Sequence, residues 1–370
     1  MKPPNMLLPA RVLRQPGLAS AFSPHEWDLL IRQARAANVL ARIATVLDSA
    51  GVMESVPIGP RGHLVSAAAL GRQQQHSATY EIDAIRRALI PTKVPLILLK
   101  GAAYLANHCD AASGRLFADV DILVPSAHLA DVESALMLNG WRSADQNPYD
   151  QRYYRRWMHE LPPMQHMRRG TSIDVHHTIL PPTAGRQLDA SKLIASARPS
   201  VGAPRVKVLT PVDMVLHSMT HLFYDGELEH GFRDLVDLDS LLLQYGADLP
   251  DFWASLRPRA QELDLERPLY YGLRYAMTFM GTPVPQQVLD GVASAGPTGL
   301  PRAIMDALFL RALRPAHASC ADRLTPLARW LLYVRSHWLR MPAHLLVWHL
   351  GQKALRRPPE QPEPVGDPQH

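Results

Sequence analysis

Apolar residues recur at helical spacing over most of the chain, and this pattern predicts a largely helical protein with one region of different character. Residues 24–51 and 62–90 keep apolar side chains three or four positions apart, which is typical of helices with one buried face. Ser23 before Pro24 is a typical helix start, with serine as the cap and proline at the first helical position. We therefore expect a helical N-terminal region over residues 1–91.

The pattern changes after this region, where short, dense apolar runs replace the helical periodicity. Residues 95–100 and 118–124 are expected to be strands, and each is followed by a segment with helical spacing. Strands of an antiparallel extension are predicted at Trp141 and over residues 152–157 and 159–167. Residues 172–179 alternate between apolar and polar and are predicted to be another strand. This alternation indicates that residues 92–182 form an α/β unit.

From Pro211 onward the apolar spacing is helical again, so residues 210–355 are expected to form a helical C-terminal domain. Residues 356–370 are rich in proline and polar side chains, which predicts a disordered tail. Near the end of the helical domain, tryptophans alternate with arginines: Trp330, Trp338 and Trp348 among Arg329, Arg335 and Arg340. We favour core tryptophans with an arginine-rich solvent face. A membrane-surface or nucleic-acid face is the alternative.

Charge and cysteine content narrow the class of protein only slightly. The formal net charge of +5 and the pI near 9.3 permit an anionic partner without requiring one. Cys109 and Cys320 are far apart and fit buried thiols in a reducing compartment. No apolar run has the length of a signal peptide, and arginines interrupt the longest candidate for a spanning helix, residues 324–350. We therefore expect a cytoplasmic protein without a transmembrane segment.

The candidate chemistry lies in three aspartates of the α/β unit. Asp119 and Asp121 alternate with apolar residues in a strand, so both side chains project to the same face. Two carboxylates on one face repel each other unless a cation lies between them, and oxygen ligands suit Mg²⁺. Asp174 has apolar neighbours in a later strand and could converge on the same ions. Three such carboxylates can hold two metal ions, which predicts a two-ion centre for phosphoryl chemistry.

Three basic or flexible positions before the acidic pair are candidates for binding phosphate. Lys100 and Gly101 lie at a junction between a strand and a helix. Glycine lets the backbone approach a phosphate, the helix start offers free N–H groups, and the lysine adds a positive charge. Arg115 could bind a phosphate oxygen with two hydrogen bonds.

The segments LILLKGAAYLANHC and FADVDILVPSAHLADVESALMLNGW, with Arg115 just ahead of the second, carry a family resemblance. Together with the later strand Ile173-Asp174-Val175-His176, they resemble the uncharacterised nucleotidyltransferase family of the DNA polymerase β-like superfamily. The resemblance is close over residues 92–182 and looser to about residue 245. It implies an α+β fold in which residues 92–209 form a polymerase-β-like core, a mixed sheet with flanking helices.

The resemblance also implies an activity, transfer of NMP from an NTP to a hydroxyl acceptor with release of pyrophosphate. Asp119, Asp121 and Asp174 would hold two Mg²⁺ ions, and Lys100, Gly101, Arg115 and His176 would contact the NTP. Most of the superfamily has Gly-Ser where this chain has Lys100-Gly101, so the lysine would replace the missing hydroxyl. After His176 the family often has tryptophan, where this chain has His177. The acceptor, whether small molecule, protein or RNA, is not specified.

Several histidines lie outside this motif set. His217 and His221 are four residues apart on one helix face, ahead of Arg233, Asp234 and Asp237. That spacing suits either a polar bridge between helices or a metal site of a helical phosphohydrolase, which is one alternative function. The other alternative is a protein that binds nucleotide or nucleic acid without turnover. His159, Glu160 and His166 are expected to be surface residues, with contact to base or acceptor as the alternative.

Overall fold

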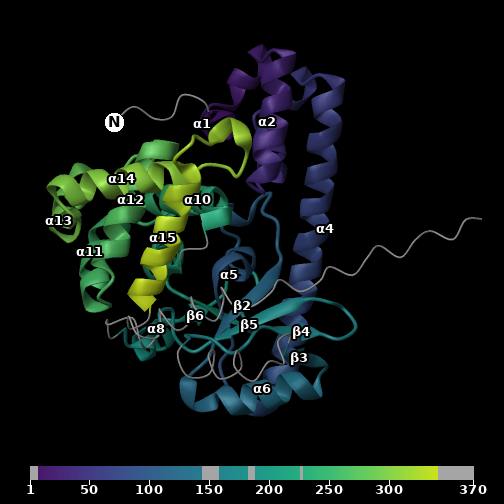
Figure 1. Ribbon diagram of the computed structural model, residues 1–370. Coiled ribbons are helices and arrows are strands. Elements are labelled where there is room, and N and C mark those ends of the chain that lie inside the picture. The colour runs from purple at the N-terminus through teal and green to yellow at the C-terminus, as the bar shows by residue number, and fades with distance from the viewer. Residues whose placement is uncertain (1–6, 144–157, 182–187, 226–227, 341–370) are drawn as a thin grey trace, which may run out of the picture.

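The computed structural model describes residues 7–143, 158–181, 188–225 and 228–340. Figure 1 shows the sheet in the lower part of the molecule, with the first helices above it and the C-terminal helices beside it. The long helix α4 (Ile58–Leu89) runs from the top, beside α2 (Pro24–Ala36), down to the sheet. The predicted disordered tail, residues 356–370, and Trp348 lie outside the described residues.

The N-terminal region is helical, as expected, but its helices differ from the prediction. Ser23 caps α2, because its hydroxyl accepts a hydrogen bond from the backbone N–H of Glu26. The predicted single helix over residues 24–51 is wrong: it is interrupted at Asn38, whose φ of 55° is left-handed, and continues as α3 (Leu40–Ser49). A short first helix, α1 (Leu8–Arg14), was not predicted.

The sheet has seven strands in the order β3-β4-β5-β2-β1-β7-β6. Their bounds are β1 (Ile97–Leu98), β2 (Asp119–Leu123), β3 (Trp141–Ser143), β4 (Met164–His166), β5 (Ser172–His176), β6 (Arg198–Pro199) and β7 (Lys207–Val208). The sheet is mixed, because β2 pairs parallel with β5 and antiparallel with β1. This confirms the predicted α+β fold with a mixed sheet. The strand predicted over residues 152–157 lies outside the described residues.

Two helices of the core follow directly from strands and lie on opposite sides of the sheet. Helix α5 (Lys100–Ala106) begins two residues after the end of β1, with Leu99 between them, and lies above the sheet in Figure 1. Helix α6 (Leu129–Leu138) follows β2 and lies below the sheet. A third short helix, α8 (Ala190–Ser196), is capped by the side chain of Asp189. The turn into α5 places its first residues beside the carboxylates of β2.

The C-terminal part is helical, in agreement with the apolar spacing. The helices are α9 (Pro211–Thr220), α10 (Gly231–Asp248), α11 (Phe252–Glu262), α12 (Glu266–Met280), α13 (Gln286–Val292), α14 (Gly299–Ala312) and α15 (Thr325–Arg340). Thr210 caps α9, and a π-helical turn over His221–Asp225 extends it. Buried apolar side chains of the N-terminal helices, the sheet and these helices form one continuous cluster. The boundaries at residues 91 and 209 stay predictions.

The interpretation of the last helix as core tryptophans with solvent arginines is wrong for the residues that the structure describes. Trp330 and Trp338 on α15 are 59% and 63% exposed. Arg335 instead points inward: it donates to the carbonyl of Phe223 and lies 5.5 Å from the ring centre of Tyr271.

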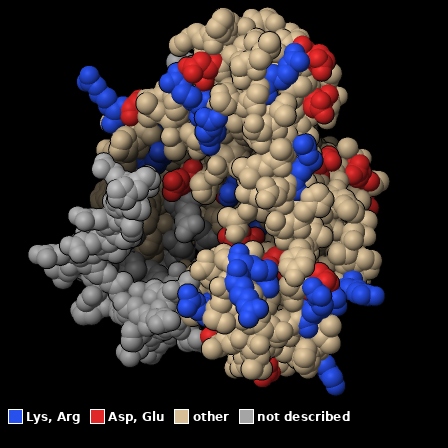
Figure 2. Space-filling model, turned by 90° about the vertical axis from the view of Figure 1, so that its right-hand side faces the viewer, with Lys and Arg blue, Asp and Glu red and all other residues tan. Residues whose placement is uncertain are grey.

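Among the described residues no helix is long and apolar enough to cross a membrane. On the face shown in Figure 2, Lys and Arg are interspersed with Asp and Glu.

Candidate active site

The three aspartates singled out from the sequence lie together on the sheet. β2 and β5 are parallel neighbours, and their register places Asp121 directly opposite Asp174. Asp119 lies two residues earlier on β2, so its side chain projects to the same face. One carboxylate oxygen from each residue lies within 4.8 Å of the others. This acidic triad (Asp119, Asp121, Asp174) therefore presents oxygen ligands at a spacing that one divalent ion can bridge.

The charges within the acidic triad are not balanced by protein groups alone. Burial opposes ionisation of Asp121, yet the Lys100 ammonium and a hydrogen bond from His176 hold the pKa of Asp121 well below its usual range. Burial and the charge of Asp121 raise the pKa of Asp174 to about 8. The charge of Asp121 also raises the pKa of Asp119, the most exposed of the three. Without a cation, the carboxylates do not all ionise readily at neutral pH.

Lys100 reaches the acidic triad from the turn into α5. Its Nζ lies 2.9 Å from Oδ1 of Asp121, and its side chain is 19% exposed. Its φ of 44° is left-handed, an uncommon conformation for a residue other than glycine. Such backbone strain persists only where the surrounding structure enforces it, and it concentrates at functional sites. The structure thus shows Lys100 in an ion pair with Asp121. Its predicted contact with phosphate stays a prediction.

Arg115 is held by a buried ion-pair network that the sequence did not reveal. Its Nε lies 2.8 Å from Oδ2 of Asp237 on α10, and Arg42 on α3 lies 2.7 Å from the other oxygen of that carboxylate. The three side chains are 9%, 2% and 6% exposed, in the order Arg115, Asp237, Arg42. The network joins the N-terminal helices, the loop before β2 and the C-terminal helices. The phosphate contact expected of Arg115 stays a prediction.

Gly101 lies where Arg115 passes closest to α5, and replacing it with alanine is expected to destabilise the protein by about 1–3 kcal/mol. A Cβ there would lie 2.2 Å from Nη1 and 2.8 Å from Cζ of Arg115. That guanidinium cannot move aside without losing its bond to Asp237. In urea unfolding, Gly101→Ala should lower the free energy of unfolding of the wild type by this amount. The same substitution should cost much less when Arg115 has already been replaced by alanine. Equal losses in both backgrounds would contradict this explanation.

His176 contacts Asp121 of the acidic triad. Its Nε2 lies 3.0 Å from Oδ1 of Asp121, and the side chain is 2% exposed. Burial disfavours the charged ring, but Glu160 and the hydrogen bond to Asp121 raise the pKa of His176 above its ordinary value. The structure therefore places the ring of His176 in hydrogen-bond contact with Asp121. Its predicted contact with the NTP stays a prediction.

A cavity of about 550 Å³ opens over the acidic triad. Its lining includes the triad, Lys100, Arg115 and Glu160, together with residues of α9, α10 and the turns before α10. The helical part contributes Ser218, His221, His230, Arg233, Asp234 and Asp237. Gly101 and His176 are not among the lining residues. The cavity has a volume within the range of small-molecule sites and is lined by charges of both signs.

The sequence model of a family described as "Uncharacterised nucleotidyltransferase" matches residues 23–281. The chain belongs to this nucleotidyltransferase family. The match begins at the cap of α2 and ends just after α12, so it includes every residue that lines the cavity. Comparisons with curated proteins and with solved structures find no match. Family membership confirms the resemblance seen in the sequence and supports nucleotidyl transfer as the general chemistry.

The helical histidines of this family member do not form a metal group with Asp234. Among the described residues, two groups of three ligands lie close enough for one ion, and neither contains His217 or His221. Burial lowers the pKa of His217 to about 3 and that of His221 well below its usual value. His221 lines the cavity with its Nδ1 4.0 Å from Asp234, whose carboxylate also binds Arg233. The geometry favours the polar bridge between helices over the phosphohydrolase site.

His159 and Glu160 are not surface residues. Both side chains are largely buried, at 7% and 16% exposure, and both line the cavity beside the acidic triad. His166 is also buried and lies edge-on to Trp141, 4.9 Å between ring centres, away from the cavity lining. His177 is half-buried, and its Nε2 lies 3.3 Å from the carbonyl of Met158. The interpretation of His159, Glu160 and His166 as surface residues is therefore wrong.

Proposed function

We propose that the protein transfers an NMP from an NTP to the hydroxyl group of an acceptor and releases pyrophosphate, with Mg²⁺ held by the acidic triad. The observation that carries this proposal is the convergence of three carboxylates within 4.8 Å at the wall of a cavity. Carboxylate oxygens are the ligands Mg²⁺ prefers, so the donor set fits this ion. Family membership over residues 23–281 supports the same reaction class.

Bound divalent ions would lower the pKa of the attacking hydroxyl and neutralise charge on the triphosphate. The acceptor oxygen would form a bond to the α-phosphorus, and the bond from that phosphorus to the bridging oxygen of pyrophosphate would break. Asp174 is the candidate to help activate the hydroxyl and take its proton, because it is the third carboxylate of the acidic triad and lies opposite Asp121 on β5. Asp119 and Asp121 would orient the reacting groups from β2.

Lys100 would change partners when the NTP enters. In the structure its ammonium neutralises Asp121 at 2.9 Å. A cation at the acidic triad would take over that neutralisation, and a phosphate oxygen in the cavity would then compete for the lysine. His176 would keep Asp121 oriented throughout, because it is buried, contacts Asp121 and does not line the cavity.

Incubation with α-³²P-labelled NTPs tests this proposal. The purified protein, Mg²⁺ and each of the four NTPs would be mixed in turn with small-molecule, RNA and protein fractions of a cell extract. We expect label to move to one fraction with stoichiometric pyrophosphate. Asp119→Asn and Asp121→Asn should abolish both signals, whereas Asp131→Asn, an exposed carboxyl on α6, should not change them.

Two results would speak against the proposal. Equal labelling by the wild type and the two triad variants would remove the acidic triad from the reaction. Tight, Mg²⁺-dependent NTP binding with no pyrophosphate release in any fraction would favour a protein that binds nucleotide without turnover.

Metal binding should release a proton. With a pKa of about 8, Asp174 is mostly protonated at about pH 7, and a carboxylate that binds a cation must ionise. Saturating the metal-free protein with Mg²⁺ should therefore release about one proton per chain. The affinity for Mg²⁺ should rise from about pH 6 to about pH 8 and then level off. A pH-stat titration measures the protons, Asp174→Asn should release almost none, and a wild-type affinity independent of pH would contradict the assignment.

A further inference from the structure

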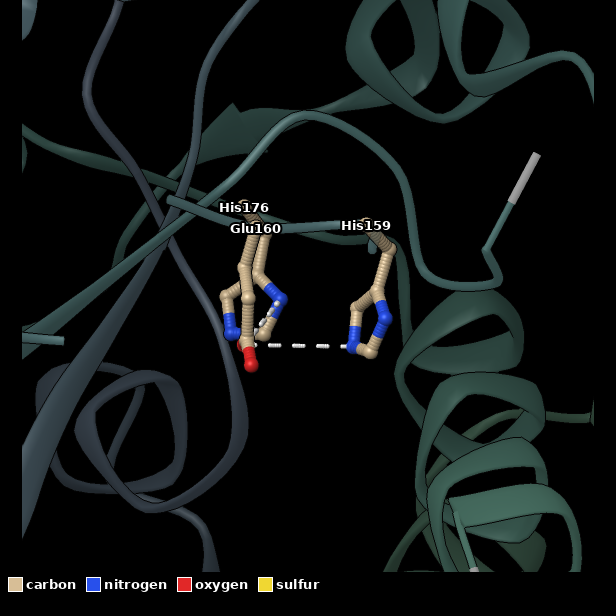
Figure 3. A group of neighbouring side chains, drawn as sticks. All are labelled: His159, Glu160 and His176. Carbon is tan, nitrogen blue, oxygen red and sulfur yellow. Dashed lines mark ion pairs between the residues drawn. The ribbon is translucent and has the colours of Figure 1, made fainter. Parts of the chain in front are cut away.

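His159, Glu160 and His176 form a second group of possible metal ligands beside the acidic triad. Figure 3 shows the three side chains lying side by side, with both imidazole rings directed at the same carboxylate. Oε2 of Glu160 lies 3.4 Å from Nδ1 of His176 and 3.9 Å from Nε2 of His159. One ligand atom from each residue lies within 4.8 Å of the others. The 3.4 Å separation is close to that between two ligands about 2 Å from a four-coordinate zinc ion, and the 3.9 Å separation is somewhat wider.

The backbone holds this group in place. Glu160 forms an antiparallel bridge with His176, and the N–H of Leu161 donates to the carbonyl of Val175 at 2.9 Å. On the other side of the group, the N–H of His177 donates to the carbonyl of His159 at 2.9 Å. The rings of His159 and His176 stack with centres 5.2 Å apart. The ligand positions therefore depend on sheet-like hydrogen bonds more than on side-chain contacts alone.

Within the described structure, one ring nitrogen of His176 makes no hydrogen bond and faces the carboxylate of Glu160. Nε2 lies 3.0 Å from Oδ1 of Asp121, an acceptor, so this nitrogen carries the hydrogen. A neutral ring then has its lone pair on Nδ1, which is buried and makes no hydrogen bond within the described structure. Nδ1 faces Oε2 of Glu160 at 3.4 Å. A lone pair and a carboxylate that face each other in a buried place require a proton or a cation between them.

We propose that His159, Glu160 and His176 bind a divalent transition-metal ion of the Zn²⁺ class, separate from the Mg²⁺ of the acidic triad. Two imidazoles and one carboxylate are a ligand set that zinc accepts, and Mg²⁺ disfavours nitrogen ligands. His159 and Glu160 line the cavity, so the fourth position of a tetrahedral ion would face it. This inference does not depend on the proposed reaction.

Such an ion would act on the acidic triad through His176. Coordination at Nδ1 fixes the hydrogen of the ring on Nε2, and that hydrogen is the one donated to Asp121. Histidines that bind metal commonly donate their other N–H to a carboxylate, so the arrangement Asp121–His176–metal has the expected form. The ion would also fasten the segment of His159 and Glu160 to β5. His176 is then a positioning residue that links two metal sites.

A zinc titration tests the proposal. Tag-free, full-length protein would be stripped with a chelator and titrated with Zn²⁺ against a chromophoric competitor, in millimolar Mg²⁺ so that the acidic triad is occupied. We expect one tightly bound Zn²⁺ per chain. His159→Ala should weaken it by at least ~100-fold and Glu160→Gln by at least ~10-fold. Co²⁺ in place of Zn²⁺ should give the visible absorption of a four-coordinate site in the wild type and lose it in both variants.

Two control variants define the site. Asp119→Asn removes a ligand of the acidic triad, and His128→Ala removes an exposed histidine on the surface. Both should bind Zn²⁺ within about threefold of the wild type, with circular dichroism to show that all variants are folded. Glu160→Gln is nearly isosteric, so it remains informative if His159→Ala fails to fold.

Two outcomes would overturn the assignment. If the wild type binds Zn²⁺ no tighter than about 100 µM, a proton on His176 neutralises the group instead. If Asp119→Asn loses Zn²⁺ while Glu160→Gln keeps it, the ion binds the acidic triad and not the histidine group. Either result leaves the nucleotidyl-transfer test unchanged.

Discussion

Asp174→Asn is expected to lower the rate of nucleotidyl transfer by about 10²–10⁴-fold while the protein stays folded. The substitution removes the candidate base and one ligand oxygen of the acidic triad. Because Asp174 is mostly protonated at about pH 7 in the metal-free protein, a neutral amide of the same shape should not lower the stability. Single-turnover transfer of label from an α-³²P-NTP measures the rate, and urea unfolding measures the stability. Asp131→Asn on α6 is the matched control.

The pH profile separates a role in the reaction from a structural one. In the wild type, activity should rise as Asp174 loses its proton and level off above its pKa, which bound Mg²⁺ shifts below about 8. In Asp174→Asn the small residual activity should lack this rise. A variant with wild-type rate and profile would remove Asp174 from the mechanism.

Asp237→Ala is expected to lower the free energy of unfolding by about 3–5 kcal/mol. Asp237 is the shared partner of Arg42 and Arg115, and all three side chains are less than a tenth exposed. Removing it leaves two buried guanidinium groups without their carboxylate, and the cost of a buried unpaired charge exceeds that of a lost hydrogen bond. Urea unfolding measures the loss, which should far exceed that of Asp110→Ala, an exposed aspartate in a short turn.

A double-mutant cycle identifies the cause of that loss. Combining Asp237→Ala with Arg42→Met should cost less than the sum of the single changes, because the methionine removes one of the stranded charges. Additive effects would mean that the ion pair contributes nothing and that the space left by Asp237 explains the loss.

The acidic triad could be predicted from the sequence because strand geometry is local. Alternation placed Asp119 and Asp121 on one face, and the apolar neighbours of Asp174 placed it in a second strand. Nothing in the local pattern shows that the two strands are adjacent in the sheet. Their adjacency was inferred from the family resemblance. Lys100 was identified from its place at a strand–helix junction, but its contact with Asp121 depends on a left-handed backbone that lysine rarely adopts.

The remaining features depend on contacts between distant parts of the chain. Arg42 and Asp237 are 195 residues apart and belong to no motif, so nothing in the sequence links them. His159 and Glu160 were assigned to the surface because a single histidine or glutamate gives no sign of its burial. The helix break at Asn38 had one local signal, since asparagine tolerates the left-handed conformation. Strands β6 and β7 have two residues each, too short for an alternating pattern.

A crystal structure with Mn²⁺ and a non-hydrolysable NTP tests the central claim most directly, because it needs no knowledge of the acceptor. We expect anomalous peaks for Mn²⁺ between the carboxylates of the acidic triad and the triphosphate, with Lys100 moved from Asp121 to a phosphate oxygen. Nucleotide and Mn²⁺ bound elsewhere, with Lys100 still on Asp121, would contradict it.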